Sequence, residues 1–217
     1  MQIIRASTCR TTPWKNGGGS TTEIAVEPSG ASLDNFDWRV SMARVASDGP
    51  FSEFAGIDRT LAVVKGGGLE LTIGGGAPVM LQRGSDSSSF AGDVATSARL
   101  IAGEITDLNV MTRRGRFGHR LRRIQGPVLC DFDGHGIAIA IAVNGSAKLI
   151  SQGQAETLGV TLGVTLGVTL DVTLDVTLGD GDAAILRPAS DSSFRIEPAA
   201  ECDCYLVLLR RHRDQPG

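Results

Sequence analysis

Short runs in which apolar and polar residues alternate, separated by glycine, recur along most of this chain. Examples are "TEIAVEP", "DLNVMTR" and "SFRIEP", and helical periodicity is hard to find anywhere in the 217 residues. A period of two places successive side chains on opposite faces of a strand, and the 28 glycines supply turns between strands. The pattern predicts an all-β protein of the sandwich or barrel type.

The two halves of the chain resemble each other. "LAVVKGGGLELTIGGGAPVML" and "IAIAVNGSAKLISQGQAETL" both read as strand, tight turn, strand, loop and strand, and Asn144-Gly145 is a hairpin signal. We therefore expect two cupin-like β-barrels of the jelly-roll type, a bicupin. The N-terminal barrel, with a ligand pocket, would cover residues 1–118, and the C-terminal barrel residues 119–217.

Residues 157–178 contain an insertion in which a four-residue unit, GVTL or DVTL, occurs five times between Gly159 and Leu178. Because four is even, an extended chain would keep Val and Leu on one face. Twenty residues would exceed an ordinary strand, and a shift by one unit restores the same pattern, so the register is poorly specified. We interpret the segment as a hairpin connection expanded by tandem duplication, which carries no chemistry. Calcium binding by Asp171 and Asp175 is disfavoured because known calcium repeats are nonapeptides.

Composition argues against several classes of protein. The formal charge is −3, and the one basic cluster, Arg113 to Arg123, is expected to be a solvated loop and not a nucleic-acid site. No stretch approaches the ~20 apolar residues that span a bilayer, and Met1 is not followed by a signal peptide. The four cysteines lack the spacing of zinc or redox motifs. We expect a cytoplasmic protein with reduced thiols and no membrane partner.

Neither a metal site nor a nucleophile is evident. A cupin metal site needs several histidines and a carboxylate, whereas His119, His135 and His212 are far apart and each is expected in a turn or terminus as a surface residue. The chain has no Gly-x-Ser-x-Gly elbow, and its "KNGGG" and "KGGG" segments do not match a phosphate loop. We therefore predict no metal, no cofactor and no catalytic residue.

Three expected strands each carry polar side chains on one face. These faces are Asp107, Asn109, Met111 and Arg113 on one strand; Asp37, Arg39 and Ser41 on another, opposite Phe36, Trp38, Val40 and Met42; and Glu23 on a third. They could line either a solvent-facing side or a barrel interior. In the second case Arg39 and Arg113 could bind carboxylates, while Glu23 and Asp107 could orient the arginines or accept an ammonium group.

Three long segments resemble the HutD family, also called HutD/Ves. They are "TPWKNGGGSTTEIAVEP", "FDWRVSMARVASDGPFSEFAGIDRTLAVVKGGGLEL" and "DLNVMTRRGR", which match in order from about Thr12 to Arg116. The resemblance implies a two-cupin fold without a metal requirement, often a dimer, encoded with enzymes of histidine utilisation. It also implies binding of a small pathway intermediate, with N-formylglutamate proposed. The tetrad repeat departs from this family's pattern.

The resemblance maps the family's motifs onto Trp14 to Gly19, Glu23, Arg39, Ser41, Phe51, Ser52, Asp58, Arg59, Asp107, Asn109 and Arg113. The glycines would let the backbone approach a ligand beside Lys15 and Asn16. Alternatively, Trp14 closes one barrel end and Lys15 is solvated. The predicted ligand-binding residues are Lys15, Asn16, Gly17, Gly18, Glu23, Arg39, Ser41, Asp107, Asn109 and Arg113.

Two functions remain open. The first is a non-catalytic protein that binds a small carboxylate such as N-formylglutamate and so senses or limits histidine utilisation, and that could form a homodimer. The alternative is a metal-free cupin enzyme, a hydrolase or isomerase that uses Glu23 or Asp107 as general base on a histidine-pathway intermediate. The lack of a recognisable nucleophile or metal site favours the binding protein.

Overall fold

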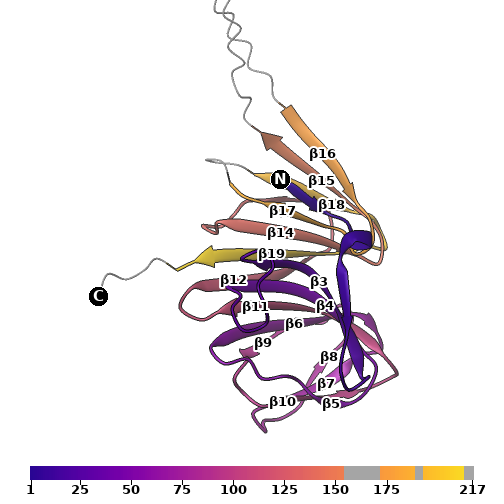
Figure 1. The fold of residues 1–217 in the computed structure, drawn as a ribbon. Coiled ribbons are helices and arrows are strands. Elements are labelled where there is room, and N and C mark those ends of the chain that lie inside the picture. Colours follow the sequence, from indigo (N-terminus) through magenta and orange to yellow (C-terminus); the bar gives the residue numbers. More distant parts are fainter. Residues whose placement is uncertain (154–171, 189–192, 213–217) are drawn as a thin grey trace, which may run out of the picture.

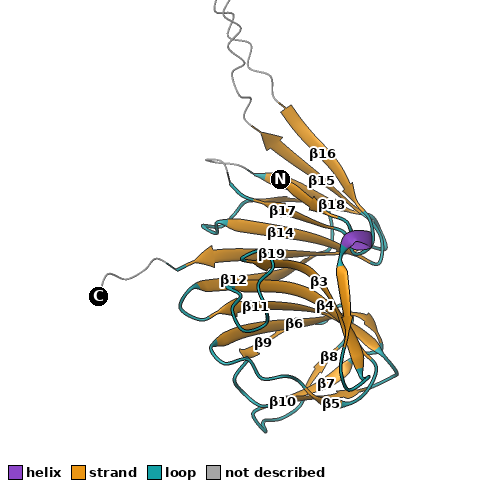
Figure 2. Ribbon diagram, in the orientation of Figure 1, coloured by secondary structure: helices purple, strands orange, loops and turns teal. Residues whose placement is uncertain are grey.

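The computed structural model describes residues 1–153, 172–188 and 193–212. Within these residues the chain is built from β-strands, and its one helical element is the 3-10 turn η1 (Ala6–Thr8) (Figure 2). The strands form four sheets, two in each half of the chain, and every strand pair is antiparallel (Figure 1). This confirms the all-β expectation.

The first half contains a six-stranded sheet and a four-stranded sheet. The six-stranded sheet has the order β2 (Arg10–Pro13), β3 (Gly19–Glu27), β4 (Trp38–Val45), β11 (Ile105–Arg113), β6 (Ile57–Gly66) and β9 (Ser88–Ala91). The four-stranded sheet has the order β5 (Gly49–Pro50), β10 (Thr96–Leu100), β7 (Leu69–Ile73) and β8 (Val79–Leu81).

The second half repeats this arrangement with five and four strands. Its five-stranded sheet has the order β1 (Gln2–Ile4), β17 (Ala183–Leu186), β14 (Ile137–Val143), β19 (Asp203–Arg211) and β12 (Phe117–Ile124). The other sheet has the order β13 (Val128–Cys130), β18 (Phe194–Pro198), β15 (Ala147–Gly153) and β16 (Val172–Leu178). The N-terminal strand β1 therefore pairs with a strand of the second half, as Figure 1 shows.

The six-stranded sheet is buried on both faces. One face packs on the four-stranded sheet of the same half, where Leu61 and Val63 meet Leu69 and Leu71. The other face packs on the five-stranded sheet, through residues such as Val110. Burial on both faces explains why β6 and β14 contain continuous apolar runs instead of strict alternation. Each fully buried aliphatic side chain stabilises the fold by about 1.5–3 kcal/mol.

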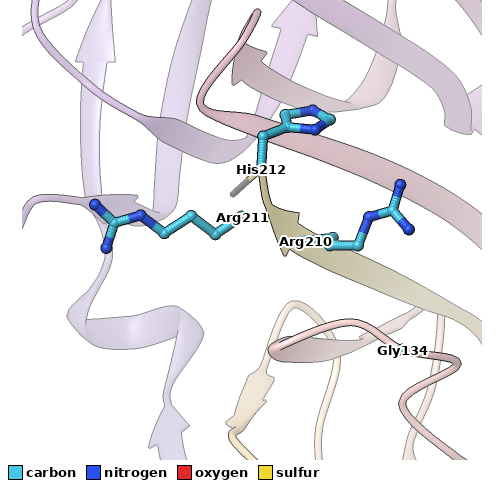
Figure 3. A pocket seen from close by; sticks show the side chains of 4 residues that line it. All are labelled: Gly134, Arg210, Arg211 and His212. Atoms are coloured by element: carbon cyan, nitrogen blue, oxygen red, sulfur yellow. The ribbon is translucent and has the colours of Figure 1, made fainter. Parts of the chain in front are cut away.

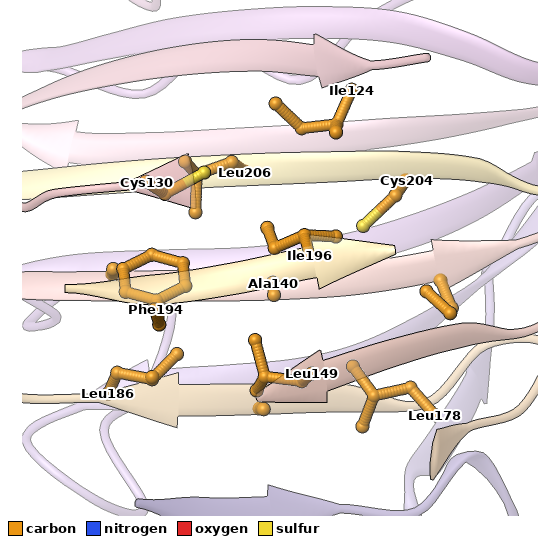
Figure 4. Packing of buried hydrophobic residues seen from close by; sticks show 14 of the residues in the cluster. Ile124, Cys130, Ala140, Leu149, Leu178, Leu186, Phe194, Ile196, Cys204 and Leu206 are labelled. Carbon is orange, nitrogen blue, oxygen red and sulfur yellow. The ribbon is translucent and has the colours of Figure 1, made fainter. Parts of the chain in front are cut away.

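The second half has its own core between its two sheets. Figure 4 shows Leu149, Phe194 and Ile196 of the four-stranded sheet together with Ala140 and Leu206 of the five-stranded sheet. All four cysteines are free, and Cys204 lies in this core, where burial raises its pKa to about 12. That thiol is protonated at neutral pH, as a packing residue should be.

The predicted insertion at 157–178 falls within the β15–β16 hairpin. Residues 154–171 lie outside the described part of the chain, whereas Val172–Leu178 form β16, paired with β15 from Gly153↔Val172 to Ala147↔Leu178. Val176 and Leu178 pack on the core of the second half, and Asp175 and Thr177 are exposed. The expected segregation of Val and Leu to one face is therefore confirmed for the last of the repeat units.

Three expectations need correction. No sheet formed by the described residues closes on itself, so each half is a pair of facing sheets and not a closed barrel. The expected basic loop is largely strand β12, and His119 on that strand is a half-buried, hydrogen-bonded residue. Phe36 precedes β4 and packs with Ile57 and Met111, apart from the face that carries Trp38. His119 and Phe36 differ from the expectation because each side chain contacts a strand that is distant in the sequence.

Candidate functional site

A group of polar side chains lies on the face of the six-stranded sheet that turns toward the four-stranded sheet. Glu23, Ser41 and Asn109 are direct neighbours across β3, β4 and β11. Arg39 donates a hydrogen bond from Nε to Glu23 Oε2 at 2.8 Å and another from Nη1 to Ser41 Oγ at 3.4 Å. We use the name buried polar cluster for Glu23, Arg39, Ser41, Arg59, Asp107 and Asn109.

Arg59, on β6, supplies a buried positive charge to this cluster. The residue is only 4% exposed, and its guanidinium carbon lies 5.2–5.4 Å from the ring centres of three phenylalanines, Phe51, Phe54 and Phe90. Three aromatic faces around one cation stabilise the charge without neutralising it. Burial lowers the pKa of Arg59 to about 10, so the side chain still carries its charge at neutral pH.

The hydrogen bonds of Arg59 do not include a carboxylate. Its Nη1 donates to the main-chain oxygen of Ser52 at 3.1 Å, and its Nη2 donates to Asn109 Oδ1 at 3.3 Å. The Nε atom is buried without a hydrogen-bond partner in the described part of the chain. A guanidinium can donate five hydrogen bonds, so this one retains capacity to bind an anion.

Asp107 is the most buried ionisable group of the cluster. The residue is 0% exposed, and neither carboxylate oxygen makes a well-aligned hydrogen bond with the residues that the structure describes, although the Asn109 side chain and the Ala43 main chain lie close enough to favour its charged form. Burial raises the pKa of Asp107 to about 7, although the positive charge of Arg59 acts in the opposite direction. A buried carboxylate without well-aligned partners destabilises a fold, and such groups concentrate at functional sites.

Five of the predicted ligand-binding residues therefore lie together on one buried face: Glu23, Arg39, Ser41, Asp107 and Asn109. Of the two possibilities left open, a solvent-facing side or an interior, the structure places this face in the interior of the first half. Glu23, whose side chain is 36% exposed, lies at its solvent edge next to Arg39, whose side chain is 13% exposed.

The Lys15 loop lies at the end of the six-stranded sheet opposite to Arg39. Lys15, Asn16 and Gly17 are exposed in the turn between β2 and β3, next to the end of β4. Gly19 pairs with Val45, whereas Arg39 lies six residues away along β4, which corresponds to roughly 20 Å. Asp107 pairs with Ala43, so the loop lies nearer to Asp107 than to Arg39 along the sheet.

The glycines of this turn have contacts of their own. Gly17 has a φ of +72°, and Gly18 accepts a main-chain hydrogen bond from Ala46 at 2.8 Å. A Cβ atom on Gly19 would lie 2.2 Å from the main-chain oxygen of Arg44 and 2.9 Å from the Trp14 ring. The close approach that the glycine run permits is therefore to the protein's own backbone and to Trp14.

The Arg113 side chain donates hydrogen bonds to main-chain oxygens and does not join the buried polar cluster. Its Nε donates to the main-chain oxygen of Phe36 at 2.9 Å, and its Nη2 donates to that of Asp34, also at 2.9 Å. Two main-chain acceptors fix the loop before β4, so the guanidinium holds that loop in place.

Arg59 was absent from the predicted ligand-binding residues, although it belongs to the family's motifs. A signal for it exists in "IDRTLAVV", where Arg59 interrupts the apolar face of Ile57, Leu61 and Val63. A charged residue within an otherwise apolar face is a buried-charge candidate. The aromatic residues around it come from two places, the loop between β5 and β6 for Phe51 and Phe54 and strand β9 for Phe90, and no local pattern brings these together.

Two hollows lie outside the buried polar cluster. One, of about 440 Å³, is lined by Gly134, Arg210, Arg211 and His212, and Figure 3 shows the two arginine side chains pointing in opposite directions. The other, of about 460 Å³, lies where the loop Gly84 to Ser87 meets β12 and Tyr205. Neither hollow is lined by a residue of the buried polar cluster.

No three of the His, Cys, Asp and Glu side chains in the described residues are grouped as metal ligands would be. None of their helices has the length and apolar character required to cross a membrane.

Solved structures resemble this chain over nearly its whole length. The structure of HutD from Pseudomonas fluorescens is 28% identical, with a TM-score of 0.76 over 98% of this chain and 99% of that one. The oxalate decarboxylase of Lactobacillus farciminis has a TM-score of 0.62 at 9% identity, covering 95% of this chain and 85% of the other. At that identity the second likeness supports the cupin-like fold alone.

Curated relatives match a shorter part of this chain than the solved structures do. An uncharacterised 21.2 kDa protein in the hutC 3' region of Pseudomonas putida is 38% identical over 126 residues, 58% of this chain and 65% of the relative. Protein Ves of Citrobacter koseri is 37% identical over 110 residues, 50% of this chain and 56% of the relative. The chain thus spans less than two thirds of the length of either relative. A model of the HutD family matches residues 6–204, and this chain belongs to the HutD family.

Proposed function

We propose that this protein binds a small carboxylate in the buried polar cluster and returns it unchanged, as a sensor or limiter of histidine utilisation. The observation that carries the proposal is the buried charge of Arg59, which has spare donors and no carboxylate hydrogen-bonded to it. A ligand carboxylate would supply the missing anion, and Ser41 and Asn109 lie beside it as polar neighbours.

Membership of the HutD family supports a role in histidine utilisation. The Pseudomonas putida relative is named for its place in the hutC 3' region, and the family resemblance suggests N-formylglutamate as the ligand. Arg39 at the solvent edge could receive the second carboxylate of such a molecule if Glu23 moves aside.

The test is calorimetric titration of N-formylglutamate into the wild type and an Arg59→Met variant. Methionine keeps much of the side-chain volume among the three rings but removes the charge, so the affinity should fall at least 30-fold, about 2 kcal/mol. Arg99→Met is the matched control, because Arg99 pairs with Glu70 on an exposed surface. Equal affinities for the two variants would contradict the role of Arg59.

An enzyme is the second candidate, because Asp107 has a pKa of about 7 and could act as a general base near neutral pH. Proton NMR of N-formylglutamate incubated with the protein separates the two functions. Release of formate that disappears in Asp107→Asn would establish a hydrolase, whereas an unchanged spectrum supports the binding protein.

We also propose that the two halves are two cupin-like units, near residues 1–118 and 119–217, in a cytoplasmic protein that forms a homodimer. Each half contributes two facing sheets, which supports the cupin-like comparison. Sedimentation analysis would measure the oligomeric state.

A further inference from the structure

We propose that the buried polar cluster takes up a proton together with its anionic ligand, and that Asp107 is the group that receives this proton. The inference rests on the proposed function, because it concerns the same site. It adds a regulatory property, in which the affinity for a carboxylate is set by pH.

The geometry places Asp107 where only a few charges can affect it. Its own strand β11 contributes Asn109, the adjacent strands β6 and β4 contribute Arg59 and Arg39, and β3, beyond β4, contributes Glu23. The opposing sheet presents the apolar residues Leu69, Leu71, Leu81 and Ala98 to this interior. Arg59 is the cation whose charge acts on Asp107.

Without a ligand these charges balance. Arg39 is hydrogen-bonded to Glu23, and Arg59 is the cation whose charge acts on Asp107. An added carboxylate beside Arg59 would leave one excess negative charge in a buried site, and an uncompensated buried charge is strongly unfavourable. Uptake of one proton from solvent restores the balance.

Asp107 is the group in the cluster that can accept this proton. Arg59 is already protonated at neutral pH, and Glu23 is partly exposed and accepts a hydrogen bond from Arg39. Asp107 is fully buried, and its two oxygens make no well-aligned hydrogen bond in the described chain. Once protonated, its O–H could donate a hydrogen bond to the ligand carboxylate, as paired carboxylates that share a proton do.

This arrangement makes binding stronger in acid. Since burial holds the pKa of Asp107 at about 7 in the free protein, its carboxyl is largely protonated at pH 6 and largely ionised at pH 8. Ligand affinity should be nearly constant below pH 6.5 and should fall about tenfold for each pH unit above 7. Proton uptake should be close to zero at pH 6 and approach one proton per ligand at pH 8.

The experiment is titration of the wild type with N-formylglutamate at pH 8.0 in HEPES and in Tris, buffers with different heats of ionisation. The difference in binding heat measures the number of protons taken up, and we expect about 0.9. Formate, the simplest carboxylate, is a second probe. Asp107→Asn should bind with no dependence of heat on buffer, and Asp175→Asn, which removes an exposed carboxylate outside the cluster, should keep the wild-type proton uptake.

The outcomes separate the two proposals. Binding at pH 8.0 with equal heats in both buffers would overturn the proton coupling and leave the proposed function standing. No binding of either probe at pH 6 or pH 8 would overturn the proposed function, and the proton coupling with it. Because the wild-type measurement gives the proton count by itself, the result does not depend on whether Asp107→Asn folds.

Discussion

Arg83, in the loop after β8, donates a hydrogen bond from Nε to Asp203 Oδ2 at 2.7 Å, although the two residues are 120 positions apart. Asp203 also accepts from Arg123 Nε at 2.8 Å and from Asn144 Nδ2 at 3.1 Å. The same Asn144 amide donates to the main-chain oxygen of Val64 at 2.9 Å. A single carboxylate, 3% exposed, thus receives hydrogen bonds from both halves of the chain, beside the apolar contact between their sheets.

Replacement of this carboxylate should destabilise the whole fold. Asp203→Asn leaves Arg83 and Arg123 without their shared anion, and we expect a loss of roughly 2–3 kcal/mol in the free energy of unfolding. Urea denaturation followed by circular dichroism measures it. Asp175→Asn is the control, because Asp175 pairs with Lys148 at the surface and should cost no more than about 0.5 kcal/mol. Similar losses for both variants would contradict the special role of Asp203.

The acid stability of the protein should depend on His119. Its Nε2 is 2.7 Å from Thr60 Oγ1 and its Nδ1 is 2.7 Å from Thr112 Oγ1, and burial lowers its pKa to about 4. The unfolded chain binds this proton near pH 6.5, so stability is lost as the pH falls from 6.5 to 4, by about 3 kcal/mol at most.

The measurement is the free energy of unfolding at several pH values between 7.5 and 4.5. A His119→Gln variant should lose this part of the acid sensitivity, whereas His135→Gln should keep it, because His135 contacts main-chain oxygens of its own loop. Parallel pH curves for the wild type and His119→Gln would show that His119 is not the group responsible.

The glycines between Trp14 and Ser20 should differ in their tolerance of alanine. Gly19→Ala places a methyl group 2.2 Å from the main-chain oxygen of Arg44 and should cost at least about 2 kcal/mol. Gly17→Ala meets no atom within 4 Å but requires a φ of +72°, which costs about 1 kcal/mol.

Thermal unfolding of these variants, with Gly126→Ala as the control, tests the expected order of the stability losses. Gly126 has an ordinary φ and no neighbour within 4 Å of an added methyl group, so the unfolding temperature of Gly126→Ala should hardly differ from that of the wild type. A Gly19→Ala protein as stable as this control would show that the run of glycines is not required for packing.

Several features of the fold could be predicted because they are local. Alternation in "DLNVMTR" assigned Asp107 and Asn109 to one face and Leu108 and Val110 to the other, and the structure agrees. The strand character of the repeat unit could also be predicted, and the structure shows it for Val172–Leu178, which form β16. Side chains on a strand must alternate, so any correct strand assignment fixes its two faces.

Other features depend on which strands meet. The structure places Lys15 and Arg39 at opposite ends of one sheet. The alternation of apolar and polar residues along a strand could not predict this, because it carries no information about the register between strands. It also could not show that Phe51, Phe54 and Phe90 surround Arg59, since two of these rings lie in the loop before β6 and the third lies on β9.

By itself, therefore, the sequence determined that the chain forms β-strands, which residues share a face, and the resemblance to one family. Only the tertiary structure decided that both faces of the six-stranded sheet are buried, so that its polar face lies in the interior of the first half with Arg59 and Asp107. The reason is physical: the period of a strand is set by local backbone geometry, whereas burial depends on packing between sheets that are distant in sequence.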